Sequence, residues 1–337
     1  MGIHQMLMGA GGKAAGSWIG DRGLFAGSGS GYPATQYINI PTTGNATTWA
    51  DQNSGRGYRP GGACAHDSRL IWMGGGGTSS SSSTIEYMSF TTNAQSQSGG
   101  NLNTSRNNLS ACSNKQGRGV SMGGGHSGWG YNEYLYMDYV AIATIGQATS
   151  FGNISARRDN APPCLSNGTI GMVGGGYLGG GPGTITIDYV TIATTSNSSN
   201  YGNLLIASSH DGLGNCQQGS ANSTIGIVYG GTKKYTGYAS YSAYNEIQSI
   251  NMTTTSNGAF FGYLTHTGQV WLSCFGNKTR GCWGGGQSGW PNYQSGTQYS
   301  ISWYIDYSTT SNSNSFGNLA GAWNQTHVYG NGASNKA

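Results

Sequence analysis

Charged residues are scarce in this sequence, and their scarcity excludes several classes of protein. Only 8% of the 337 residues are Asp, Glu, Lys or Arg, and the formal net charge is +4. Adjacent basic residues occur only at 157–158 and 233–234. Because a nucleic-acid-binding surface concentrates Lys and Arg on one face, we expect no nucleic-acid partner.

Long apolar runs and helical periodicity are also absent. No run approaches the ~20 apolar residues that span a bilayer as a helix, so we expect no membrane insertion. The segment 1–12 holds a short apolar cluster with no basic segment before it, unlike a secretory signal peptide. We therefore expect synthesis in a cytoplasm without an export signal. No stretch repeats apolar residues at the helical spacing over several turns.

Sequence patterns for metal and phosphate binding are missing as well. The six cysteines form no Cys-x-x-Cys pair, and the six histidines form no His-x-His or His-Glu-x-x-His pair, so no zinc or copper centre is expected. Glycine-rich stretches such as 174–183 lack the Gly-Lys-Ser/Thr ending of a phosphate-binding loop. We expect no metal site and no cofactor.

The sequence is instead rich in glycine and in aromatic residues. It holds 61 Gly, 22 Tyr and 9 Trp, and aromatic residues make up 11% of the chain. The apolar residues fall in short clusters separated by Gly, Ser, Asn and Thr, a pattern typical of β-strands joined by turns. Low hydrophobicity with few charges can indicate disorder, but the aromatic content favours a folded all-β domain.

One segment recurs about six times along the chain. Residues 187–195 (Ile-Asp-Tyr-Val-Thr-Ile-Ala-Thr-Thr) closely match 137–144, and weaker copies lie at 85–92 and 247–254. The copies close at positions 43, 92, 145, 195, 254 and 310, a period of roughly 50 to 60 residues. Beyond each closing position, at one fixed distance, lie Trp49, Ser98, Phe151, Tyr201, Phe260 and Phe316. All but one of these are aromatic, which chance composition would rarely produce.

Two further features share this period. Glycine clusters follow a short apolar segment at 74–76, 123–125, 174–176, 230–231 and 284–286. A cysteine precedes most clusters by about ten residues: Cys64, Cys112, Cys164, Cys216 and Cys274. We therefore predict four strands per repeat. They are a cysteine strand, a strand ending in glycines, a strand of the 187–195 type, and a strand near the late aromatic residue.

The strand around residues 187–193 carries apolar side chains on both faces, because Ile187 and Tyr189 alternate with Val190 and Ile192. Such a strand fits a sheet that is covered on either side by a neighbouring sheet, as propeller blades are. We predict a β-propeller of six four-stranded blades, with a seventh blade built from both termini as the alternative.

The two carboxylates that share one repeat position are Asp138 and Asp188. On separate blades they cannot form an acid/base pair. We assign them hydrogen bonding within each blade, and we predict no catalytic residue.

The two chain ends are predicted to close the ring. Residues 16–19 or residues 327–329 supply the first strand of the first blade, and closure within one blade removes exposed sheet edges. The resulting organisation is an N-terminal arm at 1–12, a propeller at 13–332 and a C-terminal tail at 333–337. The arm is a candidate segment for attachment to a partner.

The recurring cysteines are expected in equivalent places on different blades, too far apart to bridge one another. Their predicted role is that of small buried side chains on the innermost strands. Cys274 and Cys282 lie on adjacent predicted strands, so a disulfide between them is an alternative. We do not favour it in a protein without an export signal.

The glycine clusters and the late aromatic residues resemble kelch repeats of β-propellers, although the late residue is mostly Phe or Tyr here rather than Trp. A narrower resemblance lies in the phrase 187–195 followed by residues 201–204 (Tyr-Gly-Asn-Leu). With 151–154 and 316–319, it is similar to glycine-rich repeats in tail, fibre and other structural proteins of tailed bacteriophages. The start at 2–9 is similar to those of phage structural proteins. The resemblance implies a place in the virion, with other virion proteins and copies of the chain itself as partners.

Aromatic residues gather in the predicted loops between second and third strands. Loops 126–132 and 287–293 are related, and loop 233–244 is rich in tyrosine. The candidate ligand-binding residues are Trp129, Tyr131, Trp290, Tyr293, Tyr235 and Tyr238. These loops leave an up-and-down blade on one face, where aromatic rings stack on sugars or anchor protein partners. Packing against neighbouring loops or subunits is the alternative.

The sequence therefore predicts a non-enzymatic, tail- or fibre-associated virion protein. In this hypothesis the propeller is a rigid platform that binds virion partners and contacts a glycan of the host cell surface. A free carbohydrate-binding propeller lectin is the alternative. A glycan-cleaving enzyme ranks third, because paired carboxylates are lacking.

Overall fold

The computed structural model describes most of the chain, and every regular element within the described residues is a β-strand. The described residues are 20–26, 34–53, 61–76, 81–126, 134–159, 162–176, 183–205, 210–213, 218–235, 241–243, 245–265, 269–270, 272–288, 299–319 and 331–334.

The strands form six four-stranded antiparallel sheets, here called blades 1 to 6. Blade 1 holds, from its inner to its outer strand, β29 (Asn331–Ser334), β1 (Arg22–Ala26), β2 (Ala34–Asn39) and β3 (Thr47–Asp51). Blade 2 holds β4 (Gly62–His66), β5 (Arg69–Met73), β6 (Ser82–Ser89) and β7 (Gln97–Arg106). Blade 3 holds β8 (Ser110–Ser113), β9 (Arg118–Met122), β10 (Tyr136–Ala141) and β11 (Thr149–Asn153).

The second half of the chain continues the same order. Blade 4 holds β12 (Cys164–Ser166), β13 (Ile170–Gly174), β14 (Thr186–Thr191) and β15 (Ser199–Asn203). Blade 5 holds β17 (Gln218–Ala221), β18 (Ile225–Tyr229), β21 (Glu246–Asn251) and β22 (Ala259–Tyr263). Blade 6 holds β24 (Ser273–Gly276), β25 (Arg280–Gly284), β27 (Ile301–Asp306) and β28 (Asn314–Asn318).

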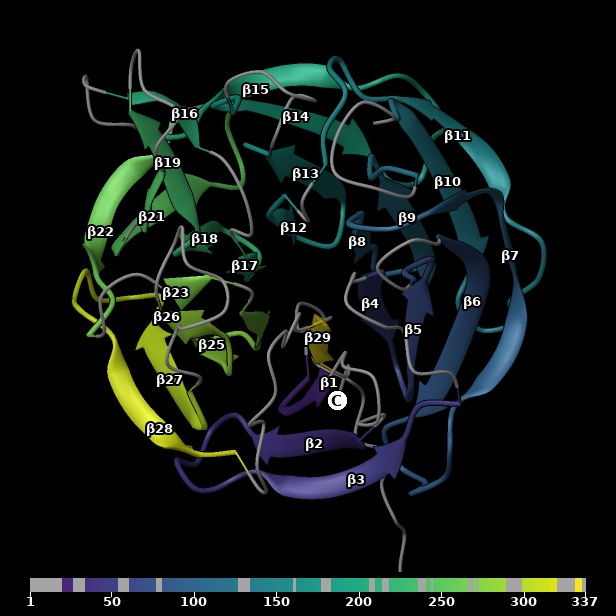
Figure 1. Ribbon diagram of the computed structural model, residues 1–337, viewed down its shortest axis with the longest axis horizontal. Helices are drawn as coiled ribbons and strands as arrows, with labels where there is room; N and C mark the ends of the chain where they lie inside the picture. The colour runs from purple at the N-terminus through teal and green to yellow at the C-terminus, as the bar shows by residue number, and fades with distance from the viewer. Residues whose placement is uncertain are drawn as a thin grey trace, which may run out of the picture.

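The six blades stand around a common centre (Figure 1). The first strand of each blade is innermost and packs against the first strands of its two neighbours, whereas the fourth strands form the rim. The chain is therefore a six-bladed β-propeller, as the repeat predicts.

The C-terminal strand β29 closes the ring by pairing antiparallel with β1, with Leu24 opposite Ala333. The prediction that both termini meet in one blade is confirmed. The closing strand begins at Asn331, after the segment 327–329 that the sequence suggested, and both that segment and the alternative at 16–19 lie outside the described residues. β29 ends at Ser334, two residues beyond the expected end of the propeller at 332.

Two small sheets extend the blades. One joins β16 (His210–Leu213), β19 (Thr232–Tyr235) and β20 (Tyr241–Ala243) beside blade 5. The other joins β23 (Gln269–Val270) to β26 (Gln287–Ser288) beside blade 6. Each sheet pairs the segment that enters a blade with the connection between the second and third strands of that blade.

The hydrophobic core is divided into six clusters, one at each interface between consecutive blades. The cluster between blades 3 and 4, for example, joins Val120 and Phe151 of blade 3 to Val173 and Ile192 of blade 4. Each blade thus buries apolar side chains on both faces, as expected. Stacking against its neighbours is what removes this apolar surface from water.

Every blade carries an irregularity where its third and fourth strands pair. The extra residue of the fourth strand is the recurring aromatic: Trp49, Phe151, Tyr201, Phe261 and Phe316. In blade 5 this residue is Phe261, which is buried, and not the neighbouring Phe260, which is exposed. The repeat register read from the sequence was therefore wrong by one residue in blade 5, and also in blade 2, where the extra residue is Gly99 and not Ser98.

Blade 2 is the exception, because Gly99 stands where the other blades have the aromatic residue. A Cβ on Gly99 would collide with the side chain of Ile145, which comes from a turn of blade 3. Ile145 has a φ of 46°, a strained value for a β-branched residue. Ile145 thus fills the space that the missing ring leaves, and the packing it gains there offsets its backbone strain.

Candidate functional site

The two faces of the ring carry different connections, because all six blades share one strand order. Connections from second to third strands, and from each blade to the next, leave from one face, here called the loop face. The tight turns between first and second strands and between third and fourth strands lie on the opposite face, here called the turn face. Figure 1 shows the ring viewed along the axis that joins these faces.

Arginines at the start of the second strand connect neighbouring blades on the turn face. The guanidinium of Arg118 lies 4.4 Å from the ring centroid of Tyr139 on the third strand. The same guanidinium donates to the carbonyls of Ile192 and Ala193 in blade 4. Arg22, Arg69 and Arg280 make the equivalent contacts. In blades 4 and 5 this position is Ile170 and Ile225.

The Phe/Tyr-Gly-Asn phrase on the outer strands forms a second connection between blades. The backbone amide of Asn203 in blade 4 donates to Oδ1 of Asn257 in a turn of blade 5, at 2.9 Å. A Cβ on Gly202 would collide with the carbonyl oxygen of Ser256. Equivalent bonds join Asn153 to Asn197, Tyr263 to Asn312, and Asn318 to Asn45. The glycine is required because the turn of the next blade lies directly against the strand.

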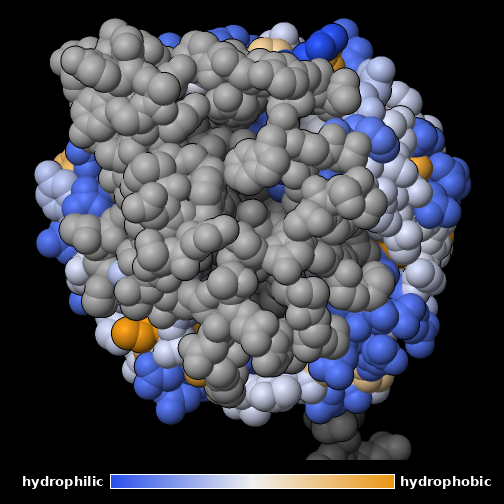
Figure 2. All heavy atoms as spheres, in the orientation of Figure 1, coloured by the Kyte–Doolittle hydropathy of each residue, from blue (hydrophilic) through white to orange (hydrophobic). Residues whose placement is uncertain are grey.

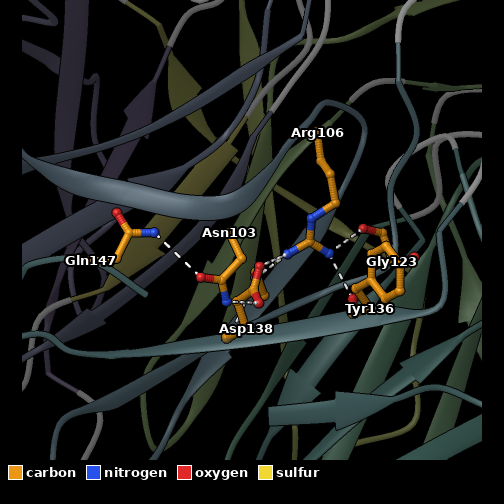
Figure 3. Close-up of polar contacts among 7 residues, drawn as sticks. Asn103, Arg106, Gly123, Tyr136, Asp138 and Gln147 are labelled. Atoms are coloured by element: carbon orange, nitrogen blue, oxygen red, sulfur yellow. Dashed lines mark hydrogen bonds and ion pairs between the residues drawn. The ribbon is translucent and has the colours of Figure 1, made fainter. Parts of the chain in front are cut away.

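A buried ion pair anchors the loop-face end of blade 3 (Figure 3). Nη2 of Arg106 lies 2.7 Å from Oδ2 of Asp138, and both side chains are almost fully buried. The guanidinium also donates to the carbonyls of Gly123 and Tyr136, each at 2.7 Å. Asn103 donates to the other carboxylate oxygen of Asp138. Arg106 ends the outer strand of blade 2, so the pair joins two blades.

Blade 4 repeats this arrangement with Arg158 and Asp188. Their closest atoms are 2.8 Å apart, and Arg158 also donates to the carbonyls of Gly175 and Thr186. Burial lowers the pKa of both Arg106 and Arg158, and the partner carboxylate opposes that shift. Asp138 and Asp188 lie on separate blades as predicted. However, each is bound by an arginine at the end of the outer strand of the preceding blade or shortly after it, so their hydrogen bonds are not confined to one blade.

The cysteines occupy two register positions rather than one. Sγ of Cys64 lies against Gly119 of the next blade, and Sγ of Cys112 lies against Gly171 in the same way. Cys164 lies one residue earlier in its strand, and Leu165 takes the position facing blade 5. Cys274 is likewise one residue earlier. Because strand side chains alternate between faces, this offset turns the two later cysteines to the opposite face, and the expectation of equivalent surroundings was wrong.

All five described cysteines are free thiols, including Cys274 and Cys282. Burial raises the pKa of the Cys64, Cys274 and Cys282 thiols. A hydrogen bond with Cys112 is the largest cause that raises the pKa of Cys164. Cys112 and Cys164 are therefore neighbours across the interface between blades 3 and 4, contrary to the predicted separation. Cys216 lies outside the described residues.

The candidate aromatic loops lie largely outside the described residues. Trp129, Tyr131, Trp290, Tyr293 and Tyr238 all fall there. Tyr235 ends strand β19, where its backbone pairs with His210, but its side chain is not described. The described strands that bound these three segments end at the loop face. There Ser81 Oγ of blade 2 lies 2.7 Å from His126 Nδ1 of blade 3.

One aromatic pair beside these loops is fully described. Tyr134 and Tyr136 lead from the loop at 126–132 into strand β10, and their rings stack at 5.3 Å with an angle of 19°. Tyr136 is 47% exposed. The amide of Tyr134 donates to the carbonyl of Gly124, and the carbonyl of Tyr136 accepts from Arg106. The buried guanidinium therefore holds the backbone that presents the two rings.

This pair is the candidate functional site. Stacked tyrosine rings with an exposed face provide apolar area and terminal hydroxyls, which suits a ligand that is apolar on one face and polar at its edges, such as a sugar. The sequence analysis missed the pair because the candidate residues were taken from the loop itself. The sequence feature that could have revealed the pair is Tyr136 itself, because blades 2 and 4 have Thr84 and Thr186 at the equivalent position.

Neither a metal cluster nor a membrane-crossing helix occurs in the part of the chain that the structure describes. No three His, Cys, Asp or Glu side chains gather there to hold an ion. No helix among those residues is long and apolar enough to cross a bilayer.

The geometry defines the class of the protein as a six-bladed β-propeller with repeated inter-blade connections. Among solved structures, the one described as "Structure of YjhT" is similar, with a TM-score of 0.66 and 13% sequence identity over 86% of this chain and 93% of that chain. At this identity the likeness shows the fold alone. No protein-family model matches the sequence, and no curated protein matches it.

Proposed function

We propose that this chain is a non-enzymatic structural and binding protein of a tailed-bacteriophage virion. In this proposal it is tail- or fibre-associated and uses the propeller as a rigid platform. The single observation that carries the proposal is that six arginines of the chain hold neighbouring blades together. Arg22, Arg69, Arg118 and Arg280 connect blades on the turn face, and Arg106 and Arg158 do so near the loop face.

Rigidity follows from how these contacts are distributed. Each blade is joined to the next by backbone and side-chain bonds at the rim and by a buried apolar cluster, and four of the six blades add an arginine on the turn face. A platform of this kind holds its loops in fixed positions, which reduces the entropy that binding must overcome.

The proposed platform presents aromatic residues on its loop face to a glycan of the host surface. Support comes from the half-exposed stack of Tyr134 and Tyr136, next to the loop that contains Trp129 and Tyr131. In this proposal Trp290, Tyr293, Tyr235 and Tyr238 belong to the same face.

The assignment to a virion rests on the resemblance of the repeats to phage structural proteins and to kelch blades. Part of this resemblance lies in the Tyr-Gly-Asn-Leu segment, and in this protein that segment connects neighbouring blades. The shared sequence therefore reflects how the blades are joined. The proposed partners are other virion proteins and further copies of this chain. A free propeller lectin is the second candidate. It is favoured by the same tyrosine stack, because such a stack could bind a sugar in a protein that is not part of a virion.

Two measurements test these proposals. Mass spectrometry and imaging of purified particles should show the protein at a fixed copy number in symmetric positions, and its absence from particles would contradict the virion assignment. A glycan array with Trp129→Ala, Trp290→Ala and Tyr136→Thr should show lost binding, since Thr stands at this position in blade 4. Unchanged binding in all three variants would contradict the loop-face site.

A further inference from the structure

Blade 5 differs from the other five blades on its outer strand. Phe260 and Tyr263 stand on β22 at positions that are small and polar in every other blade. The residues equivalent to Phe260 are Thr48, Ser98, Ser150, Asn200 and Ser315, and those equivalent to Tyr263 are Asp51, Asn101, Asn153, Asn203 and Asn318. The fold therefore has no need of aromatic side chains at these two positions.

The two rings lie together and are accessible. Their centroids are 5.0 Å apart with an angle of 61° between the planes. Phe260 is 47% exposed and Tyr263 is 44% exposed. The buried neighbour Phe261 belongs to the core between blades 5 and 6, so the exposed pair lies on the other face of its strand.

Polar groups surround this pair. Glu246 stands directly opposite Tyr263, and Gln248 stands opposite Phe260, so the four side chains share one face of the sheet. Oε1 of Gln248 accepts from the amide of Leu205, which follows blade 4. Nε2 of Gln248 is buried and has no hydrogen-bond partner among the described residues. Because Gln248 is fully buried, its amide group belongs to the junction with blade 4 and does not reach the surface.

We propose that Phe260 and Tyr263 form a saccharide-binding site on the rim of blade 5, separate from the loop face. Two rings at an angle can contact the apolar face of one or two sugar rings. Glu246 would accept hydrogen bonds from sugar hydroxyls. This site does not depend on the loop-face site proposed above.

The small apolar area favours a saccharide over a protein partner. Two half-exposed rings offer on the order of 200 Å², given that a whole aromatic side chain buries ~150–250 Å². A stable protein interface buries about 800 Å² on each partner. On the face shown in Figure 2, the described residues at the rim are mostly hydrophilic, with only isolated hydrophobic residues.

The test is saturation-transfer NMR with the full chain. The probes are methyl glycosides and trisaccharides of glucose, galactose, rhamnose and N-acetylglucosamine. The double variant Phe260→Ser/Tyr263→Asn installs the residues of blade 6, so its melting temperature should stay within about 2 °C of the wild type, as for other surface substitutions. Its affinity for the bound saccharide should fall at least about tenfold. The control Phe260→Tyr/Tyr263→Phe keeps both rings and should keep binding.

Three results would overturn the proposal. In the first, no probe binds the wild-type chain. In the second, Phe260→Ser/Tyr263→Asn binds as the wild type does while Tyr136→Thr does not, which would place all saccharide binding on the loop face. In the third, the double variant changes the sedimentation of the chain but no saccharide affinity, which would assign the pair to a protein contact.

Discussion

The ring of Phe275 in blade 6 occupies the space in which Gly23 of blade 1 would carry a Cβ. Phe275 lies on β24 and Gly23 on β1, and the same relationship joins Cys64 to Gly119 and Cys112 to Gly171. A side chain of the innermost strand thus packs onto a glycine of the following blade. The size of that side chain varies around the ring, from serine to phenylalanine, whereas five of the six second strands keep the glycine and blade 2 has Leu70 there.

Gly23→Ala should therefore destabilise the protein by about 2–3 kcal/mol, since it overpacks a filled interface. Thermal or urea unfolding measures the loss. Adding Phe275→Leu should restore part of it, because the smaller side chain leaves room for the new methyl group. Gly44→Ala is the matched control, because nothing lies within 4 Å of a Cβ at Gly44. Equal losses in Gly23→Ala and Gly44→Ala would contradict this interpretation.

Arg158→Met should cost about 3–5 kcal/mol, since it leaves the buried carboxylate of Asp188 without its charged partner. The double variant Arg158→Met/Asp188→Leu should recover most of that loss, because a well-packed apolar pair can replace a buried ion pair. A double-mutant cycle on urea unfolding measures the coupling. Additive losses would mean that the two side chains do not act as a pair.

Arg118→Ile should cost far less, about 1 kcal/mol, since it gives blade 3 the residue that blades 4 and 5 carry at this position. The loss consists of exposed hydrogen bonds and a cation–π contact, each of modest value. Urea unfolding of both variants gives the quantity to compare, which is the loss in free energy of unfolding in Arg158→Met relative to that in Arg118→Ile. A loss in Arg118→Ile as large as in Arg158→Met would contradict the distinction between buried and peripheral arginines.

Gly202→Ala should destabilise the rim junction between blades 4 and 5 by about 2–4 kcal/mol, since the new Cβ meets the backbone carbonyl of Ser256 and no flexible side chain can yield. Asn257→Ala removes one hydrogen bond to the amide of Asn203 and should cost about 1 kcal/mol. Hydrogen exchange of the Asn203 amide should accelerate in both variants. Unchanged protection of that amide would contradict the assigned bond.

The protein should lose stability in alkali. Burial raises the pKa of the Cys64, Cys274, Tyr229 and Tyr307 side chains in the folded state. In the unfolded chain these groups have ordinary pKa values, about 8.5 for Cys and about 10 for Tyr. The unfolded chain therefore loses protons at a lower pH than the folded protein does. The contribution of these groups to the free energy of unfolding is present below about pH 8 and is lost as the pH rises above it. Melting temperature between pH 6 and 11 measures this.

A matched variant isolates the thiol contribution to this pH dependence. Cys64→Ala/Cys274→Ala should melt lower at neutral pH because of lost packing, yet its melting temperature should fall less between pH 8 and 9.5. A fall identical to that of the wild type would assign the alkaline loss to other groups.

The repeat allowed the architecture to be predicted, because strand count, blade number and closure all follow from its period. The exact register was harder to predict. Phe260 and Phe261 are adjacent aromatic residues, and composition cannot say which of them the irregularity of the outer strand turns inward. Cys164 and Cys274 fit the predicted cysteine spacing, but each lies one position earlier in its strand than Cys112 does. The reason is that the turn after each of them is shorter than the turn after Cys112.

The partners of the buried aspartates were also beyond sequence reasoning. Arg106 and Arg158 lie outside the strongest repeat segment, in stretches where the sequence between copies differs in length. The link from each arginine to Asp138 or Asp188 depends on how one blade follows another in space. The exposure of Tyr136 and Tyr263 likewise depends on neighbouring blades, so only the three-dimensional structure reveals it.

The closing strand β29 affects how the protein must be made. A ribosome adds about 5–20 residues per second, so tens of seconds pass between the emergence of β1 and that of Asn331. During this interval β1 lacks its inner neighbour, and the nascent ring remains open between its last and first blades. The ring is therefore sealed only once β29 has been made, and a chain that stops between Asn318 and Asn331 leaves five finished blades beside an unsealed one.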